Sequence, residues 1–131
     1  MIGNPGTTTV EQITQMSLWC IAKAPLIIST DLRNASNTTI EILTNAQAIA
    51  VNQDSLGVPG KLVQRTEAGG QVWTGELSGG RYAAVLVNTL NTTDLVVELD
   101  WSLLPGQVVT TTPFLVNDVW NTTGGDVLFK Y

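Results

Sequence analysis

Apolar residues before Gly60 recur at helical spacing, whereas those after it alternate as they do in strands. The clearest helical series comprises Val10, Ile13, Met16 and Cys20. Thr8 and Glu11 match a capping box, in which the threonine accepts a bond from a free N–H group and the glutamate reaches back. We therefore predict an α-helix over residues 10–23.

A proline follows this helix and is followed in turn by a short apolar run. Pro25 prevents the helix from continuing, because proline lacks an N–H group and disfavours helical geometry in the residue before it. Residues 26–29 are rich in isoleucine, which is typical of a strand buried on both faces of a parallel sheet. Since a parallel strand needs neighbours and the chain holds one such unit, we infer a slice of a larger α/β fold.

Two short helices are expected next, over residues 37–43 and 46–51. Ser36 and Asn45 are good N-caps for them, because their side chains can accept bonds from free N–H groups of the first turn. The run Leu56-Gly-Val-Pro-Gly60 then breaks regular structure. We place a domain boundary there, with an α/β domain over residues 1–59 and a second domain over residues 60–131.

The second domain is dominated by threonine, valine and glycine, and its short alternating runs are separated by turn signals. This pattern predicts an antiparallel β-sandwich or barrel. The run over residues 81–87 is the best candidate for its central strand. The predicted strands cover residues 61–66, 71–77, 81–88, 95–101, 107–112, 114–120 and 126–131.

Charge and residue usage exclude several classes of function. The net charge is −5, so the chain lacks the positively charged surface that binds nucleic acid. No apolar run approaches the ~20 residues that span a membrane. The chain has no histidine, which excludes Ser-His-Asp and Cys-His nucleophile systems and His-based zinc sites within it. Cys20 has no disulfide partner and lies among apolar residues, so we predict an inert core thiol. We expect no cofactor and no metal.

Few carboxylates are placed where they suggest chemistry. Asp31 directly follows the predicted buried strand, and α/β active sites gather at the C-terminal ends of parallel strands. It also occupies the place of a turn aspartate that bonds local backbone, and this structural interpretation is favoured. Ser29 and Asp31 are therefore candidate residues for an active-site rim. Asp54 is interpreted as structural, since the polar side chains of the Asn52-Gln-Asp run can hydrogen-bond at the end of a helix.

Aromatic residues and glycosylation sequons complete the candidates. Three tryptophans alternate with valine or leucine, so core packing is favoured over stacking on sugar rings: Trp73, Trp101 and Trp120. Four sequons mark candidate N-glycosylation sites and indicate a secreted glycoprotein: Asn34, Asn37, Asn91 and Asn121. The first two are too close together for both to be modified easily, whereas the last two lie in predicted hairpin loops.

Several motifs together resemble one enzyme family. In the first part they are Gly3-Asn4, Gln15-Met-Ser-Leu-Trp19, Ala24-Pro-Leu-Ile, Asp31-Leu-Arg, Glu41-Ile-Leu-Thr-Asn45 and Ile49-Ala-Val-Asn-Gln-Asp-Ser-Leu-Gly57. In the second part they are Trp73, Ala83-Ala-Val-Leu-Val-Asn88, Asp100-Trp-Ser and Val116-Asn-Asp-Val-Trp120. They resemble the eukaryotic α-galactosidases of glycoside hydrolase family 27, the melibiase type. The resemblance covers nearly the whole chain and is most specific between residues 15 and 57.

The resemblance implies a fold that explains the isolated strand. The family has a (β/α)₈ barrel followed by a C-terminal antiparallel β-sandwich. Residues 10–23 resemble the helix after barrel strand seven, residues 26–29 resemble strand eight, and residues 36–52 resemble the closing helices. We therefore expect an α/β fragment, the helix–strand–helices end of such a barrel, followed by an antiparallel β-sandwich domain that is incomplete beyond residue 131.

The resemblance also implies an activity whose catalytic residues have no counterpart in this chain. The family removes terminal α-linked galactose with retention, using two aspartates on earlier barrel strands whose motifs have no match here. No catalytic residue is carried over, so we expect a C-terminal fragment without turnover by itself. The intact enzyme would take α-galactosides, need no cofactor, often form homodimers, and be secreted, lysosomal or vacuolar. The alternatives are a stand-alone carbohydrate-binding or interaction module, an α-N-acetylgalactosaminidase fragment, and a remnant that does not fold stably.

Overall fold

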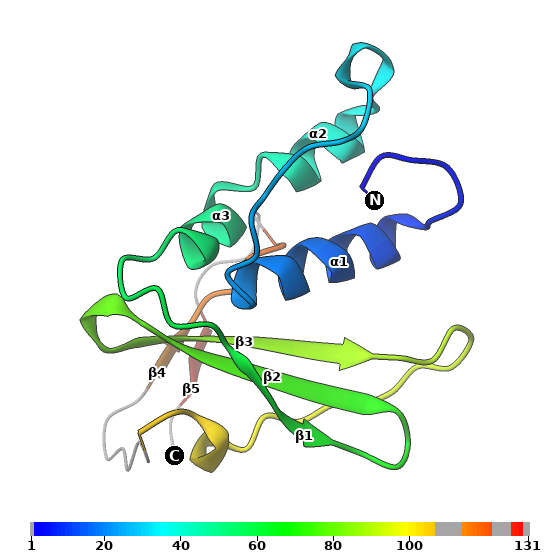
Figure 1. Cartoon of the computed structure of the whole chain (residues 1–131). Helices are drawn as coiled ribbons and strands as arrows, with labels where there is room; N and C mark the ends of the chain where they lie inside the picture. The colour runs from blue at the N-terminus through cyan, green and yellow to red at the C-terminus, as the bar shows by residue number, and fades with distance from the viewer. Residues whose placement is uncertain (1, 107–113, 122–126, 130–131) are drawn as a thin grey trace.

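The computed structural model describes residues 2–106, 114–121 and 127–129, and in them helices come first and antiparallel strands follow (Figure 1). This is the architecture expected for the end of a (β/α)₈ barrel followed by a β-sandwich. Within this part of the chain, no helix is long and apolar enough to cross a membrane. The elements are α1 (Thr9–Ile21), η1 (Leu32–Asn34), α2 (Asn37–Leu43), α3 (Ala46–Asn52), β1 (Lys61–Arg65), β2 (Gly70–Leu77), η2 (Ser78–Gly80), β3 (Arg81–Asn88), η3 (Trp101–Leu103), β4 (Phe114–Val116) and β5 (Val127–Phe129).

Helix α1 begins and ends through local hydrogen bonds. The Thr8 hydroxyl accepts from the Glu11 N–H at 3.2 Å and the Glu11 carboxylate accepts from the Thr8 N–H at 2.7 Å, which confirms the capping box. At the other end Lys23 adopts a left-handed φ of 56°. Its N–H donates to the Cys20 carbonyl, and the next N–H donates to the Trp19 carbonyl. This pattern of a Schellman motif ends the helix at Ile21, before the proline is reached.

Helices α2 and α3 start where predicted. The Ser36 side chain accepts from the Thr39 N–H at 3.1 Å, and the Asn45 side chain accepts from the Gln47 N–H at 3.0 Å. Both helices pack on α1 around a small core of buried residues, formed by Ile2, Met16, Cys20, Ile42 and Ala48. Burial raises the pKa of the Cys20 thiol to about 11, and the side chain lies in this core, so the prediction of a core thiol is confirmed.

The main sheet has the strand order β1-β2-β3, with antiparallel pairing throughout. The prediction that residues 81–87 form its central strand is wrong for the described strands, because β3 lies at one edge and β2 in the middle. Two short turns fold β1 and β3 back onto opposite sides of β2, so the middle strand in sequence is also the middle strand in space. Strand β2 is accordingly the most buried, with Val72 fully covered and Thr74 2% exposed.

The remaining β predictions are met in part. Strands β4 and β5 pair with each other in a second, two-stranded sheet, and β4 ends at Val116 rather than at residue 120 as predicted. Residues 95–100 join neither sheet within the described part of the chain, and η3 follows them. They lie across the face of the main sheet opposite α1, where the Thr74 hydroxyl donates to the Leu103 carbonyl at 3.1 Å (Figure 1). The predicted strand over residues 107–112 lies outside the described residues.

Backbone and side chains from both halves of the chain bond to each other. The Gly60 N–H donates to the Ile21 carbonyl at 2.8 Å, which places the start of the sheet against the end of α1. The segment after β4 returns to the helices, where the Trp120 indole donates to the Ser17 hydroxyl at 2.9 Å. The Asn45 side chain donates to the Val119 carbonyl at 3.0 Å. The helices and the main sheet therefore pack as two layers (Figure 1).

Residues 26–29 depart from the prediction. They run as an extended connection from α1 toward α2 and pair with no strand in the described part of the chain (Figure 1). Ile27 is 77% exposed and Ile28 50% exposed, so the prediction of a strand buried on both faces is wrong for this chain. The physical reason is that a parallel strand is buried by its neighbours, and no described strand lies beside this one.

Candidate functional site

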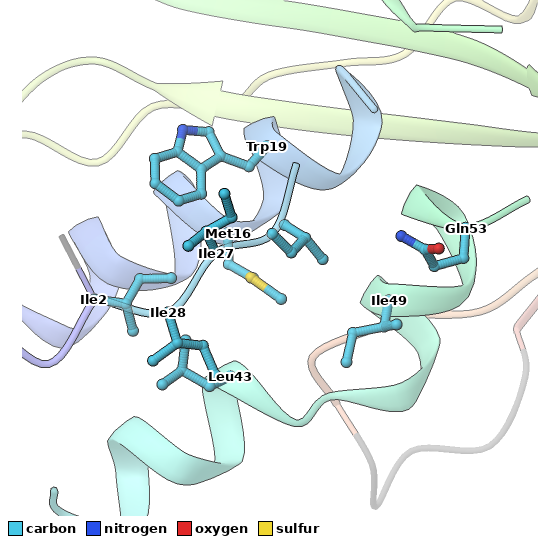
Figure 2. A pocket seen from close by; sticks show the side chains of 9 residues that line it. Ile2, Met16, Trp19, Ile27, Ile28, Leu43, Ile49 and Gln53 are labelled. Carbon is cyan, nitrogen blue, oxygen red and sulfur yellow. The ribbon is translucent and has the colours of Figure 1, made fainter. Parts of the chain in front are cut away.

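An apolar groove of about 260 Å³ lies beside the extended segment. Its walls come from α1, from the end of α2, from α3 and the residue after it, from Ile2 of the N-terminal loop and from the segment itself (Figure 2). The lining residues are Ile2, Met16, Trp19, Leu26, Ile27, Ile28, Leu43, Ile49 and Gln53. Gln53 is the one polar residue among them, whereas a ligand site normally places several polar groups that orient the ligand. The groove is therefore suited to covering by apolar side chains rather than to binding a sugar.

The N-terminal loop meets the far end of the extended segment. The Thr30 hydroxyl lies 3.2 Å from Asn4 Oδ1, to which it donates, and the Gly3 N–H donates to the Gln12 side chain at 3.1 Å. Gly3 has a φ of 82°, and a Cβ there would lie 2.6 Å from Thr39 Cγ2. Only glycine therefore lets the loop approach so closely. Sequence reasoning did not find the Asn4–Thr30 contact, although the Gly3-Asn4 motif marked one side of it.

Ser29 and Asp31, the predicted rim residues, flank Thr30 at this place. The Asp31 carboxylate accepts bonds from the Arg33 side chain at 2.7 and 2.9 Å and from the Arg33 N–H at 3.0 Å. These bonds hold the pKa of Asp31 below its usual value, the side-chain bonds from Arg33 contributing most. Asp31 thus caps η1, which confirms the favoured turn interpretation. A role of Ser29 and Asp31 at an active-site rim remains a prediction.

Asp54 has a wider role than its sequence context indicates. Its carboxylate accepts from the Leu56 N–H at 3.1 Å, from the Ser78 N–H at 2.8 Å, from the Ser78 hydroxyl at 2.7 Å and from Arg81 Nη2 at 2.9 Å. The Asp54 side chain is 2% exposed. The bonds from Ser78, first of all that of its N–H, lower the pKa of Asp54 to about 2. The residue joins the end of α3 to the β2–β3 turn, and its oxygens are occupied by structural donors.

The tryptophans and the sequon asparagines are placed as follows. Trp120 and its neighbour Val119 are partly buried and pack against the helical core, which confirms core packing for Trp120. Trp73 is half-buried and its indole donates to the Gln71 side chain at 3.1 Å, and Trp101 is half-buried in η3. The sequon asparagines are exposed at all four positions: Asn34, Asn37, Asn91 and Asn121.

Comparisons with known proteins match both halves of the chain. Residues 1–54 match the family model described as alpha galactosidase A, and residues 67–128 match the one described as alpha galactosidase C-terminal beta sandwich domain. The chain is 41% identical over 119 residues to an α-galactosidase of Cyamopsis tetragonoloba. It is 43% identical over 121 residues to an α-galactosidase of Oryza sativa subsp. japonica. Each alignment covers 91% of this chain and 28% of the relative.

Solved structures give the same result. The crystal structure of α-galactosidase I from Mortierella vinacea is similar with a TM-score of 0.64 and 34% identity, over 66% of this chain and 22% of that one. The α-galactosidase of Saccharomyces cerevisiae with raffinose is similar with a TM-score of 0.62 and 30% identity, over 66% of this chain and 21% of that one. The chain thus spans less than a third of the length of the curated relatives it matches.

Proposed function

Since the chain belongs to the α-galactosidases of glycoside hydrolase family 27, as their C-terminal portion, we propose that it closes the catalytic barrel of an enzyme that hydrolyses terminal α-D-galactosyl residues. In this proposal residues 26–29 are the last barrel strand, α1 to α3 are the helices that cover it, and the antiparallel strands form the β-sandwich. The order of the two family matches along the chain supports this assignment.

The apolar groove carries the proposal. Its lining includes Ile27 and Ile28, which are 77% and 50% exposed, next to backbone that pairs with no described strand. Covering both side chains would contribute about 2–4 kcal/mol, at the usual value for burying an isoleucine. A barrel strand laid alongside the segment would bury these side chains and satisfy the backbone groups together. The groove is thus the surface that such a barrel would need to present.

We further propose that the 131-residue chain has no turnover by itself. Retaining hydrolysis needs two carboxyl groups about 5–5.5 Å apart, one as nucleophile and one as acid/base. Asp31 is engaged by Arg33, and Asp54 is engaged by Ser78 and Arg81. Neither carboxylate is free for either role. The resemblance places both catalytic aspartates on earlier barrel strands, in motifs that have no match in this chain, so in this proposal the two catalytic groups belong to the other part of the barrel.

A chimera tests this proposal. The aligned C-terminal portion of the Cyamopsis tetragonoloba α-galactosidase is replaced by this chain, and release of nitrophenol from para-nitrophenyl α-galactoside is measured for the chimera and for the chain alone. We expect hydrolysis by the chimera and none by the chain above a matched blank from cells with the empty vector. A chimera that melts cooperatively yet is inactive would contradict the proposed role in closing the barrel. Activity of the chain alone, retained through repeated purification, would contradict the absence of turnover.

We also propose that the intact protein is secreted or is delivered to a lysosome or vacuole. The support is the set of four sequons, whose asparagine side chains are all exposed to solvent. Fractionation of the source tissue with an antibody against this chain tests the proposal. Recovery of the protein in the cytosolic fraction alone would contradict it.

A further inference from the structure

We propose that Asn4 and Thr30 are positioning residues, whose hydrogen bond ties together the last two strand-to-helix loops of the proposed barrel and so holds the rim of its substrate site. The inference rests on the proposed function and deepens it, because it names two residues of this chain on which the shape of that site depends. They act through Ser29 and Asp31, the candidate rim residues on either side of Thr30.

The two loops belong to the same face of the proposed barrel. Residues 2–8 lead into α1, whereas residues 30–36 follow the proposed last strand and lead into α2. In a (β/α)₈ barrel, the loops that lead from a strand into a helix lie at the C-terminal face of the strands, where the active site is built. In Figure 1 the first turns of α1 and α2 lie at the same end of the helix layer. A contact between these loops therefore bears on the shape of that face.

The N-terminal loop is held in shape by Gln12, a residue of α1 that is 9% exposed. Its Oε1 accepts from the Gly3 N–H at 3.1 Å. Its Nε2 donates to the Thr7 carbonyl at 3.3 Å and to the Thr7 hydroxyl at 3.2 Å. These bonds hold the loop on both sides of Asn4, so the Asn4 side chain is presented at a fixed place to the neighbouring loop.

The half-buried Thr30 joins the second loop to the first. Its hydroxyl donates to Asn4 Oδ1 at 3.2 Å. A Cβ at Gly3 would lie 2.9 Å from Thr30 Oγ1 and 3.3 Å from Thr30 Cγ2, so the threonine also packs against the backbone of the N-terminal loop. Ser29 and Asp31 are exposed on either side of it. Thr30 thus fixes the course of this segment, while its two neighbours stay accessible to a substrate.

Loss of the tie should weaken substrate binding rather than turnover. Contacts that a rim makes equally with the substrate and with the transition state lower KM and leave kcat unchanged. Loss of one neutral hydrogen bond that orders such contacts corresponds to about a three- to tenfold rise in KM. A merely structural role would instead reduce the folded fraction, which lowers the apparent kcat and leaves KM unchanged. The KM value therefore separates the two roles.

The first experiment uses the 131-residue chain and needs no activity. Amide exchange is followed by NMR, and each variant is examined in the loop that it does not alter: the Gly3 amide in Thr30→Val and the Arg33 amide in Asn4→Ala. Both amides donate hydrogen bonds within their own loops. We expect each to exchange about fivefold faster than in the parent, because an untied loop opens more often.

Thr14→Val is the matched control for this experiment. It also removes a hydroxyl group from a half-buried threonine, but that hydroxyl donates to the Val10 carbonyl at 2.9 Å within α1. We expect both amides to exchange at the parent rate in this variant. Unchanged rates in Thr30→Val and Asn4→Ala would overturn the proposed tie, whether or not the chimera is active.

The second experiment measures KM and kcat of the chimera for para-nitrophenyl α-galactoside. We expect Asn4→Ala and Thr30→Val each to raise KM by about three- to tenfold and to keep kcat within about twofold. The double variant should match the single ones, because both remove the same bond. Thr30→Ser keeps the hydroxyl group and should restore the KM lost in Thr30→Val, and Thr14→Val should keep the parent KM.

The results distinguish this inference from the proposed function. In an active chimera, an unchanged KM or a fall in kcat alone in Asn4→Ala and Thr30→Val would overturn the positioning role. Additive effects in the double variant would show that the two residues do not act as a pair. A folded but inactive parent chimera would contradict the proposed function instead, and the exchange rates of the 131-residue chain would then test the tie by themselves.

Discussion

Replacing Ile27 with aspartate separates the isolated chain from the chain built into a complete barrel. In the isolated chain the side chain is 77% exposed, so we expect a change of no more than about 0.5 kcal/mol in the free energy of unfolding. In the chimera a covered isoleucine would contribute about 1–2 kcal/mol from the area that is still exposed here. The substituted carboxylate would also have to leave water, at a cost of several kcal/mol. The chimera should therefore lose at least about 3 kcal/mol of stability, together with its hydrolytic activity.

Urea denaturation of both proteins measures this difference, and nitrophenol release reports the activity of the chimera. Val10→Asp is the matched control, because Val10 is 72% exposed, lies in the first turn of α1 and does not line the apolar groove. We expect Val10→Asp to be tolerated in both proteins. If Ile27→Asp lowers the stability of the chain and of the chimera equally, the groove stays uncovered in the chimera. If Val10→Asp lowers the stability and activity of the chimera as much as Ile27→Asp does, the effect is not specific to the groove.

Three further predictions concern the packing of the isolated chain. The folded-state pKa of Asp54 is about 2, whereas its ordinary value is 3.8. Its ionised carboxylate therefore stabilises the fold above about pH 4, and this stabilisation is lost as the pH falls toward 2. Thermal melts across this pH range should show a smaller loss of stability for Asp54→Asn than for the parent. Gly60→Ala should destabilise the chain by about 1–3 kcal/mol, because a Cβ there would lie 2.6 Å from Ile21 Cγ1 and 2.9 Å from the Thr74 carbonyl oxygen. Urea denaturation measures this loss, and an unchanged unfolding midpoint would contradict this packing. Cys20, buried and with its thiol pKa raised to about 11, should react with a thiol reagent only after unfolding, so rapid labelling of the native chain would contradict its burial.

The helix starts could be predicted from the sequence because their signals are local. Each N-cap joins residues two or three positions apart, as in Thr8 with Glu11 and Asn45 with Gln47. Such bonds form whenever the chain turns into a helix, whatever surrounds it. The capping interpretation of Asp31 was predictable for the same reason, since its partner Arg33 is two residues away.

Features that depend on distant partners were not predictable in this way. Asp54 bonds to Ser78 and Arg81, 24 and 27 residues further on, and nothing in its neighbourhood in the sequence points to them. The apolar character of residues 26–29 correctly marks a surface that favours burial, but burial itself depends on strands beside it. The place of β3 at the sheet edge likewise follows from the strands that pair with β2, not from the composition of β3.

The most direct test that the chain closes an α-galactosidase barrel is the rate of nitrophenol release by the chimera. This rate is measured beside the unaltered Cyamopsis tetragonoloba enzyme and this chain alone. We predict that the chimera hydrolyses para-nitrophenyl α-galactoside and that the chain alone does not exceed the blank. A chimera that is folded, as judged by a cooperative melt, and that releases no more nitrophenol than the chain alone would contradict this role.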